Sequence, residues 1–465
     1  MEIVQQGEYS KSGRKRPIEP FLLGLLILLI PIGIFFLPHL FPTRIGTAYI
    51  WVYGLQTVLM LYVWKRQSFD QKSLLFLGVF LAISLAIILP YTSNDTERYL
   101  WDGAVFLSGV DPYLIAPNDP AVADLRALWP TPEEHSDYPT LYPPGALLLF
   151  SICALTGPVL GIWIWGFMTT IALIATLAIG AKLLEKHGAP QNFALLALSP
   201  LLMFETQIGG HLDIFCVLGL VSALYAIKCE KFIIAGLIIG LAATIKFLPA
   251  IIVGPFLFYL KPRQAAKLFL SSAFIWCFVY TVFLSLGYKP LGLLPVFFEK
   301  WRGGAPLYPV LESLSEVLSL SAGQFLFGGL TLAVLAFAFS AKLARDQKIF
   351  LALGLSLSVP LLLSPVLFPW YLLILIPILM LRPNMTLILV MGCAPLSYVV
   401  LDRWLSESIW VQPNWPSWVL LFAIIFGLSW TDYPSAYFCG NLQRSNEADQ
   451  VKNTIIEYEI VQSVT

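Results

Sequence analysis

Two carboxylates and a guanidinium stand close together directly after a long apolar run: Asp95, Arg98 and Asp102. A carboxylate can take the proton of a hydroxyl nucleophile, and a guanidinium can hold a phosphate or a second carboxylate. Separations of three and four residues place all three side chains on one face of a helix. Their types and spacing therefore suit a general-base site.

The surrounding residues predict a short helix at this place. Asn94, followed three residues later by Glu97, has the form of an N-cap with a capping box. The opposite face of the helix is apolar and would meet lipid; it carries Leu100, Ala104 and Leu107. The same pattern also fits a second interpretation, a solvated, capped helix that lies on the bilayer without a catalytic part.

Four ionisable residues lie within apolar stretches further along the chain: Glu205, His211, Asp213 and Lys246. Such residues are costly in apolar surroundings and are candidates for a functional site. His211 and Asp213 are two residues apart and cannot share a helix face, so their spacing supports neither a zinc site nor a catalytic triad. The alternatives are a polar helix break for His211 and Asp213 and a snorkelling side chain for Lys246.

The composition is that of an integral membrane protein. Of the 465 residues, 58% are hydrophobic and 12% are charged, whereas soluble proteins carry about 25% charged residues. Lys+Arg and Asp+Glu balance at 28 each, so no basic field is available to bind nucleic acid. The six cysteines stand singly, which is typical of buried apolar residues rather than of a disulfide framework or a metal cluster.

Apolar segments of about 20 residues can cross a bilayer as helices. Measured this way, the sequence predicts an all-α polytopic membrane protein with about 12 to 15 transmembrane or re-entrant helices. The expected segments are 21–41, 46–64, 73–91, 144–157, 159–181, 191–207, 212–228, 232–246, 248–260, 268–287, 318–341, 349–365, 370–381, 385–401 and 415–430. Several are short, so some must be tilted, paired or re-entrant.

Basic residues in the short connections indicate which ends are cytoplasmic. They precede the first span and recur near 65–72, 261–267 and 342–348. The resulting division is a cytoplasmic segment 1–20, a membrane domain 21–430 and a polar cytoplasmic tail 431–465, with large outer loops at 92–143 and 288–317. The first outer loop is acidic, with nine Asp and Glu against two Arg, and is expected to contain short surface helices. If one apolar piece of 142–181 is partial, His211 and Lys246 also reach the outer side near this loop.

Ordered strings in this loop resemble a known family. They are Asn94-Asp95 with Arg98-Tyr99 and Trp101-Asp102-Gly103, then Gly109 with Asp111-Pro112-Tyr113 and Ala116-Pro117, then the run Tyr138 to Pro144. Together they resemble the first outer loop of polyprenyl-phosphate-sugar-dependent glycosyltransferases of the GT-C superfamily, above all the bacterial mannosyltransferase-like branch. Later pieces follow in the same order, namely Ser199-Pro200 with Glu205, Gly210-His211 with Asp213, Lys246-Phe247 with Pro249, and Ser364-Pro365 with Pro369-Trp370-Tyr371.

This resemblance implies a GT-C-like fold with an outward-facing cavity and a general base that matches Asp95. It also implies a polyprenyl-phosphate-linked hexose as donor, with mannose expected, and a glycolipid or glycan hydroxyl as acceptor, with inversion at the sugar. Seven residues are candidates for binding the donor phosphate or the sugar: Arg98, Asp102, Tyr142, His211, Asp213, Lys246 and Arg302. Glu97 stands where such relatives often have an aromatic residue, which could alter the acceptor side.

No cofactor and no dedicated metal site are expected, although the sequence leaves a divalent metal open. The expected location is a bacterial cytoplasmic membrane with the active site on its outer face. The main alternative function is a transporter or flippase of a lipid-linked saccharide, in which Glu205, Asp213 and Lys246 would line the path. The sequence shows no paired halves of the kind that many transporters have. A third interpretation is a non-catalytic partner in glycan assembly.

Overall fold

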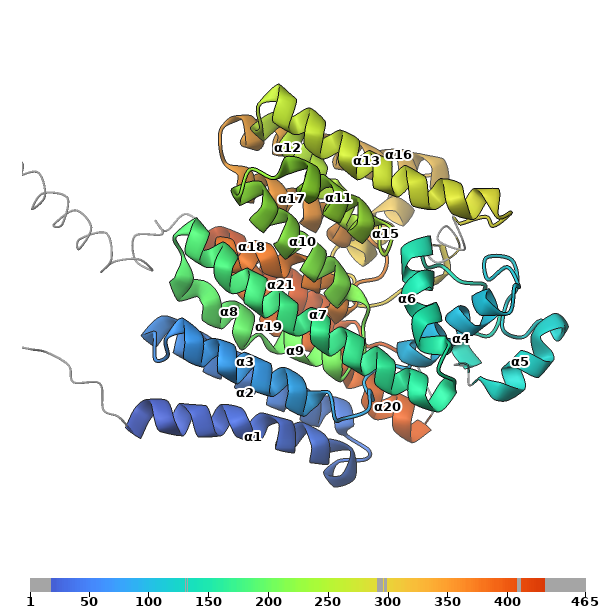
Figure 1. Cartoon of the computed structure of the whole chain (residues 1–465), viewed down its shortest axis with the longest axis horizontal. Coiled ribbons are helices and arrows are strands. Elements are labelled where there is room, and N and C mark those ends of the chain that lie inside the picture. Colours follow the sequence, from blue (N-terminus) through green and yellow to red (C-terminus); the bar gives the residue numbers. More distant parts are fainter. Residues whose placement is uncertain are drawn as a thin grey trace, which may run out of the picture.

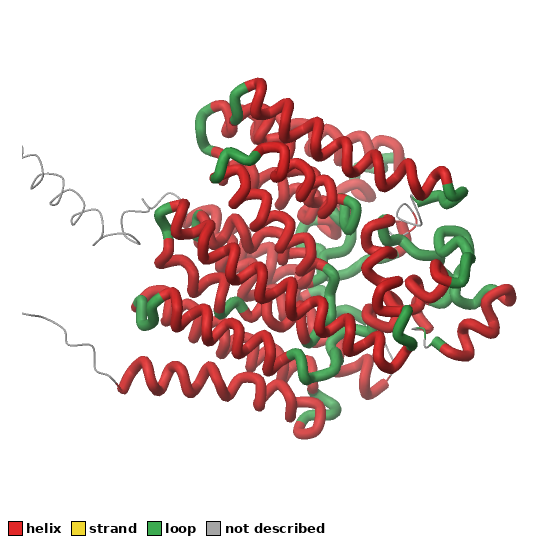
Figure 2. Tube along the Cα trace, viewed as in Figure 1, coloured by secondary structure: helices red, strands yellow, loops and turns green. Residues whose placement is uncertain are grey.

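Figure 1 shows the computed structural model of the chain, which describes residues 18–407 and 411–430 apart from 130, 132, 291–295, 297 and 298. Helices form most of it and loops join them (Figure 2). Within the described residues, the one extended pairing is a parallel bridge between Gly303 and Val366. The predicted fold class, an all-α polytopic membrane protein, is confirmed.

The helices follow one another with short connections. The first part of the chain forms α1 Ile18–Leu40, α2 Ile45–Arg66, α3 Gln71–Leu85, α4 Asp95–Leu107, α5 Ala123–Leu128, α6 Pro144–Ala154, α7 Pro158–His187, α8 Ala194–Ala197, α9 Pro200–Gln207, α10 Asp213–Lys228, α11 Phe232–Ala243 and α12 Val253–Tyr259. The second part forms α13 Pro262–Ser285, α15 Tyr308–Val317, α16 Ala322–Arg345, α17 Ile349–Leu363, α18 Ile376–Leu381, α19 Met385–Cys393, α20 Val400–Glu407 and α21 Trp415–Trp430. The 3-10 helices η5 Pro369–Leu375 and η6 Ala394–Val399 lead into α18 and α20.

Six helices in the described part of the chain are long and apolar enough to cross a membrane: Glu19–Leu40, Ile45–Arg66, Pro158–His187, Pro262–Ser285, Ala322–Arg345 and Met385–Trp404. Seven shorter apolar helices accompany them, so the total agrees with the predicted range of about 12 to 15. Between 11% and 50% of each long helix is buried inside the protein. Much of each surface is therefore left for lipid, and the backbone hydrogen bonds are satisfied within the helices.

One predicted segment, 191–207, is interrupted. The helix α8 ends at Ala197 and α9 begins at Pro200, since proline at the first helical position cannot continue the preceding helix. The Ser199 hydroxyl caps α9 by accepting from the backbone N–H of Leu202 at 3.2 Å. The break shortens α9, and the carbonyl of Ile208 just after it accepts from the backbone N–H of Tyr91 at 3.1 Å.

Small residues allow neighbouring helices to approach closely. A Cβ atom at Gly236 would lie 2.3 Å from the backbone oxygen of Leu268, and one at Gly240 would lie 2.4 Å from that of Ser272. The helices α11 and α13 thus meet backbone to backbone along a glycine stripe, as membrane helices often do.

The helices α4, α5 and α6 form a separate layer at the right-hand end of the bundle in Figure 1. A Cβ at Gly103 would lie 2.5 Å from the backbone of Phe150, so α4 crosses α6 in close contact. The predicted short helices of the first outer loop are confirmed. The predicted lipid face of α4 is largely wrong, because Leu100 and Ala104 are buried in protein and only Leu107 is exposed.

The start of α4 corrects a second detail of the prediction. Asn94 does occupy the N-cap position, but its side chain makes no capping hydrogen bond, so the expected capping box is not formed. Instead, the backbone N–H of Asp95 donates to the Ser93 hydroxyl at 3.1 Å.

The second outer loop is hydrogen-bonded to the short connection between α17 and η5. The backbone N–H of Gly303 donates to Pro365 at 3.3 Å, and that of Leu367 donates to Gly303 at 2.9 Å. The predicted segment 1–20 and tail 431–465 lie outside the described residues, except for 18–20, which begin α1.

Candidate active site

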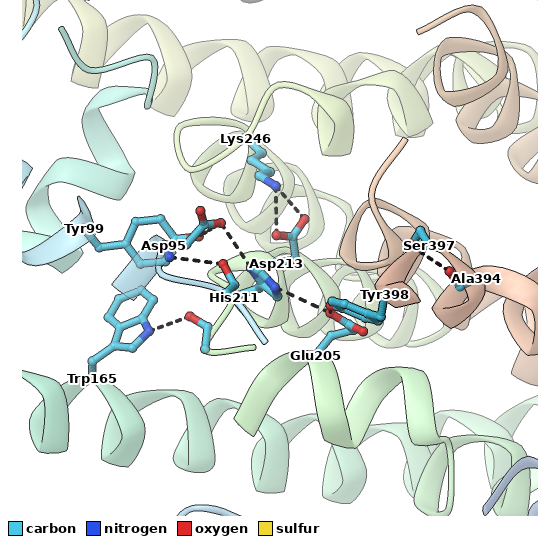
Figure 3. Close-up of polar contacts among 12 residues, drawn as sticks. Asp95, Tyr99, Trp165, Glu205, His211, Asp213, Lys246, Ala394, Ser397 and Tyr398 are labelled. Atoms are coloured by element: carbon cyan, nitrogen blue, oxygen red, sulfur yellow. Dashed lines mark hydrogen bonds and ion pairs between the residues drawn. The ribbon is translucent and has the colours of Figure 1, made fainter. Parts of the chain in front are cut away.

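Asp95, His211 and Glu205 form a line at the end of the bundle that meets α4 (Figure 3). His211 Nδ1 lies 3.2 Å from Asp95 Oδ2, and His211 Nε2 lies 3.5 Å from Glu205 Oε2. The side chains of His211 and Glu205 are fully buried, whereas 17% of the Asp95 side chain is exposed. The imidazole thus connects an accessible carboxylate to a buried one.

The break between α9 and α10 fixes the position of His211. Gly210 has φ +68°, a conformation that favours glycine, and a Cβ there would lie 2.4 Å from Thr96 Oγ1. Trp165 Nε1 donates to the Gly210 carbonyl at 2.7 Å. The Trp370 ring stacks on the imidazole with ring centroids 3.8 Å apart. The break is therefore pressed against α4, and the ring has little room to turn.

Both polar contacts of the Asp95 carboxylate fall on one oxygen. Tyr99 donates to Asp95 Oδ2 at 3.2 Å, and His211 reaches the same atom. Asp95 Oδ1 makes no hydrogen bond with the described residues. Tyr142 is half-buried beside this carboxylate, and its ring packs edge-on against Tyr99 at 5.2 Å.

Asp213 and Lys246 form a second, neighbouring pair. Lys246 Nζ lies 2.8 Å from both carboxylate oxygens of Asp213 and 4.7 Å from the centre of the Tyr371 ring. The Lys246 side chain is 24% exposed and that of Asp213 is 9% exposed. Lys246 follows α11 and is held in place because the Gly145 N–H at the start of α6 donates to the Thr244 carbonyl at 2.8 Å.

Arg98 and Asp102 do not line this cluster but hold the loop above it. Arg98 Nε donates to Asp102 Oδ1 at 3.0 Å, and its two terminal nitrogens donate to the carbonyls of His135 and Tyr138 at 2.8 Å. Thr140 donates to Asp102 Oδ2 at 2.6 Å. Burial raises the pKa of Asp102, and Arg98 and Thr140 only partly oppose this effect.

Arg302 lies in the second outer loop, with 41% of its side chain exposed. Its guanidinium contacts Glu312 at 3.4 Å and lies 5.0 Å from the centre of the Tyr308 ring. The structure therefore brings together Asp95, Tyr142, His211, Asp213 and Lys246 among the predicted site residues. It places Arg98 and Asp102 in the loop support and Arg302 in the neighbouring loop.

The surroundings of Asp95 favour its charged form. Burial is the largest single influence and would raise the pKa of this carboxyl, but the contact with His211 and the charges of His135 and Lys246 together outweigh it. The pKa of Asp95 is therefore held below its usual range. A partly exposed carboxylate that stays ionised at neutral pH can accept a proton from a hydroxyl group.

No group of three His, Cys, Asp or Glu side chains suited to a metal ion occurs in the part of the chain that the structure describes. The site offers instead one cation, Lys246, beside one base.

Residues 34–262 match the family described as alpha-(1->6)-mannopyranosyltransferase, N-terminal domain. These residues belong to that family. The match confirms the resemblance to GT-C-type mannosyltransferases. It supports glycosyl transfer, with mannose as the sugar, as the activity of this protein. Its substrates are accordingly a sugar donor and a glycan or lipid acceptor. No curated protein and no solved structure matches the chain.

Part of the cluster comes from residues that follow the matched region. Trp370 and Tyr371 lie at the start of η5, and the sequence analysis named them only as part of the family resemblance, without a role at the site. Tyr398, whose hydroxyl donates to Glu205 Oε2 at 2.6 Å, gave no signal in the sequence. Its 193-residue separation from Glu205 hides the pair from any local pattern.

Proposed function

We propose that this mannosyltransferase takes its mannosyl group from a polyprenyl-phosphate donor and attaches it to a hydroxyl of a glycolipid or glycan, with inversion and with Asp95 as the general base. The main supporting observation is a partly exposed carboxylate, Asp95, held by the buried His211 beside the Asp213–Lys246 pair.

The reaction needs one base. The acceptor oxygen attacks the anomeric carbon from the side opposite the phosphate, so the new carbon–oxygen bond forms as the old one breaks and the configuration inverts. The acceptor proton passes to Asp95 Oδ1, the oxygen that His211 and Tyr99 leave free. The bonding electrons leave with the phosphate, which departs as an anion, so that no second carboxylic acid is needed, in contrast to glycoside hydrolysis.

Lys246 is the cation best placed to receive the phosphate. An ammonium group has three N–H donors. Two of them point to the Asp213 oxygens at 2.8 Å, and the side chain is partly exposed, so one donor is left for a phosphate oxygen. Fixed charges of this kind stabilise a leaving anion strongly in a site that excludes water. Arg98 and Asp102 act in this proposal as loop supports. Arg302 is paired with Glu312 in the second outer loop, and the proposal assigns it no part in the reaction.

The membrane setting supports a lipid-linked donor on the outer face. The connections that follow α2, α7, α12 and α16 carry or adjoin basic residues and lie at the left-hand end of Figure 1, opposite to α4. Basic connections are typical of the cytoplasmic side. With this orientation, the cluster opens at the outer surface of a bacterial cytoplasmic membrane, where apolar helices can hold a polyprenyl tail in lipid.

The test measures transfer of radiolabelled mannose from a mannosyl-phosphopolyprenol to extracted membrane glycolipid by purified protein. We expect transfer by the parent and a loss of about 10²–10⁴-fold in Asp95→Asn, because the base is removed. Asp124→Asn, the same change at an exposed position on α5, should transfer at the parent rate.

Equal transfer by Asp95→Asn and the parent would overturn the assignment of the base. Proteoliposomes in which the parent moves the labelled lipid across the bilayer without forming a glycosidic bond would overturn the donor assignment and favour transport.

A further inference from the structure

Two connections that are far apart in the sequence form one basic surface at the end of the bundle opposite to α4 (Figure 1). They join α12 to α13 and α16 to α17. We propose that this surface binds the headgroup of an anionic phospholipid whose acyl chains lie against the adjoining helices. The site is independent of Asp95 and of the proposed reaction, and in the orientation given above it faces the cytoplasmic leaflet.

The surface is strongly positive. Residues 261–267 and 342–348 hold six basic residues and one acidic residue, Asp346. All six bases are exposed, and no carboxylate in the described part of the chain forms an ion pair with any of them. They are Lys261, Arg263, Lys267, Lys342, Arg345 and Lys348. Their excess of positive charge is therefore left for an external anion.

Side-chain contacts bring the two connections together. The Arg345 guanidinium lies 4.7 Å from the centre of the Phe258 ring, which belongs to α12 and stands three residues before Lys261. The helix α12 packs against both α13 and α16, and the centre of the Phe258 ring lies 6.2 Å from that of Phe337 on α16. The bases of the two connections therefore lie in one region, although α13, α15 and α16 separate them in the sequence.

Apolar surface adjoins the charges, which favours a lipid over a soluble anion. Leu257 on α12 is 39% exposed, and Phe337 on α16 and Phe269 on α13 are each 46% exposed. A free phosphate needs only the cations, whereas a phospholipid also needs apolar side chains beside them for its acyl chains. Basic clusters between helices at a membrane surface are typical binding sites for anionic headgroups.

A second basic region at the same end of the bundle provides the comparison. The ends of α7 and α10 carry four exposed lysines, but two exposed glutamates, Glu185 and Glu230, stand among them. The lysines are Lys182, Lys186, Lys228 and Lys231. Basic residues at one end also orient a membrane protein in the bilayer. A general effect of charge would involve both regions, whereas a headgroup site involves only the first.

The test measures lipid binding by the purified protein. The protein in detergent is mixed with phosphatidylglycerol or phosphatidylcholine, and native mass spectrometry counts the bound lipids. We expect the parent to bind phosphatidylglycerol more tightly by about tenfold or more, because each basic residue near an anionic group strengthens the attraction about fivefold. The fourfold variant Lys261→Gln, Arg263→Gln, Lys342→Gln and Arg345→Gln should lose this preference.

The matched control removes the same number of charges from the second region, with Lys→Gln at its four lysines. It should keep the preference within about twofold, because exposed charges farther away than the Debye length are screened. Arg263→Lys with Arg345→Lys preserves the charge of the first region and should also keep the preference. An equal loss in the control and in the fourfold variant would overturn the inference, since it would show a diffuse effect of charge.

Two measurements use the parent alone and decide the question even if the fourfold variant fails to fold. Equal binding of the two lipids by the parent would overturn the inference. Glycerol phosphate has the headgroup chemistry without acyl chains, and we expect it to compete poorly with phosphatidylglycerol. Displacement of the lipid by an equal concentration of glycerol phosphate would assign the surface to a free phosphate and overturn the lipid assignment.

Discussion

Two aspartates lie two turns apart on α4, each next to a nitrogen-bearing side chain, yet the two carboxylates differ in almost every other respect. Asp95 is partly exposed, touches His211 and has a pKa below its usual range. Asp102 is buried, is bound by Arg98 and Thr140 and has a raised pKa.

The difference shows that residue type and helix face do not decide the role of a carboxylate. Asp95 and Asp102 lie on the same face of one helix. Asp102 has both oxygens occupied by fixed donors, which makes it a support for the loop at 133–140. Asp95 has one oxygen held and one free, which makes it available for proton transfer.

The largest expected effect is on folding, and it comes from the pair of Arg98 and Asp102. Arg98→Met leaves Asp102 as a buried charge without its partner and releases the carbonyls of His135 and Tyr138. Breaking a buried ion pair from one side destabilises by about 3–5 kcal/mol. Thermal unfolding in detergent should show this loss for Arg98→Met and a much smaller one for Asp95→Asn.

Two further variants sharpen this test. Arg126→Met, the same change on α5 where the guanidinium meets backbone carbonyls rather than a buried carboxylate, should cost far less. The double variant Arg98→Met with Asp102→Leu should recover part of the stability, because no buried charge is left unpaired. If Asp95→Asn unfolded as readily as Arg98→Met, both turns of α4 would be structural and the contrast would be lost.

The fold could be read from the sequence because membrane spans are local. An apolar run can be recognised from its own residues, without knowing which helices pack against it. Each predicted span contains a helix. The partial piece within 142–181 is α6, which has 11 residues. Its packing against α4 depends on Gly103 and Phe150, a contact that no local pattern in the sequence indicates.

Only the residue types and the sequence motifs of the site could be predicted, not the contacts between its side chains. His211 and Lys246 stood out because ionisable residues are rare in apolar surroundings. Asp95 stood out through its spacing to Arg98 and its place in the first-loop motif. Arg98 was expected at the donor phosphate, but its nitrogens are taken by carbonyls of a loop about 40 positions away, and no spacing rule reports such contacts. The same holds for Tyr398, which meets Glu205 across most of the second half of the chain.

A smaller effect is expected from the hydroxyl that completes the Asp102 site. Thr140→Val removes the 2.6 Å hydrogen bond to Asp102 Oδ2 and keeps the shape of the side chain. Hydrogen bonds to charged groups contribute about 1.5–3 kcal/mol, so the loss of unfolding free energy should be below that of Arg98→Met. Thr156→Val is the matched control, because Thr156 is exposed in the turn after α6 and its hydroxyl donates to the backbone carbonyl of Cys153. A loss equal to that of the control would show that Thr140 does not support the loop.

The smallest expected effect concerns the pH profile of the parent, and it separates the two carboxylates without any mutation. The pKa of Asp95 is held below its usual range, so this base stays ionised as the pH falls and is lost only when the pH passes that lowered pKa. The kcat of mannosyl transfer should therefore change by less than about twofold between about pH 7.5 and 5.5. Asp102, whose pKa is raised by burial, would take up its proton at a higher pH. A fall in kcat within this pH range, in parent protein that remains folded, would mean that a group with a raised pKa, such as Asp102, controls the reaction. Asp102 would then be the base, and Asp95 would have the supporting role.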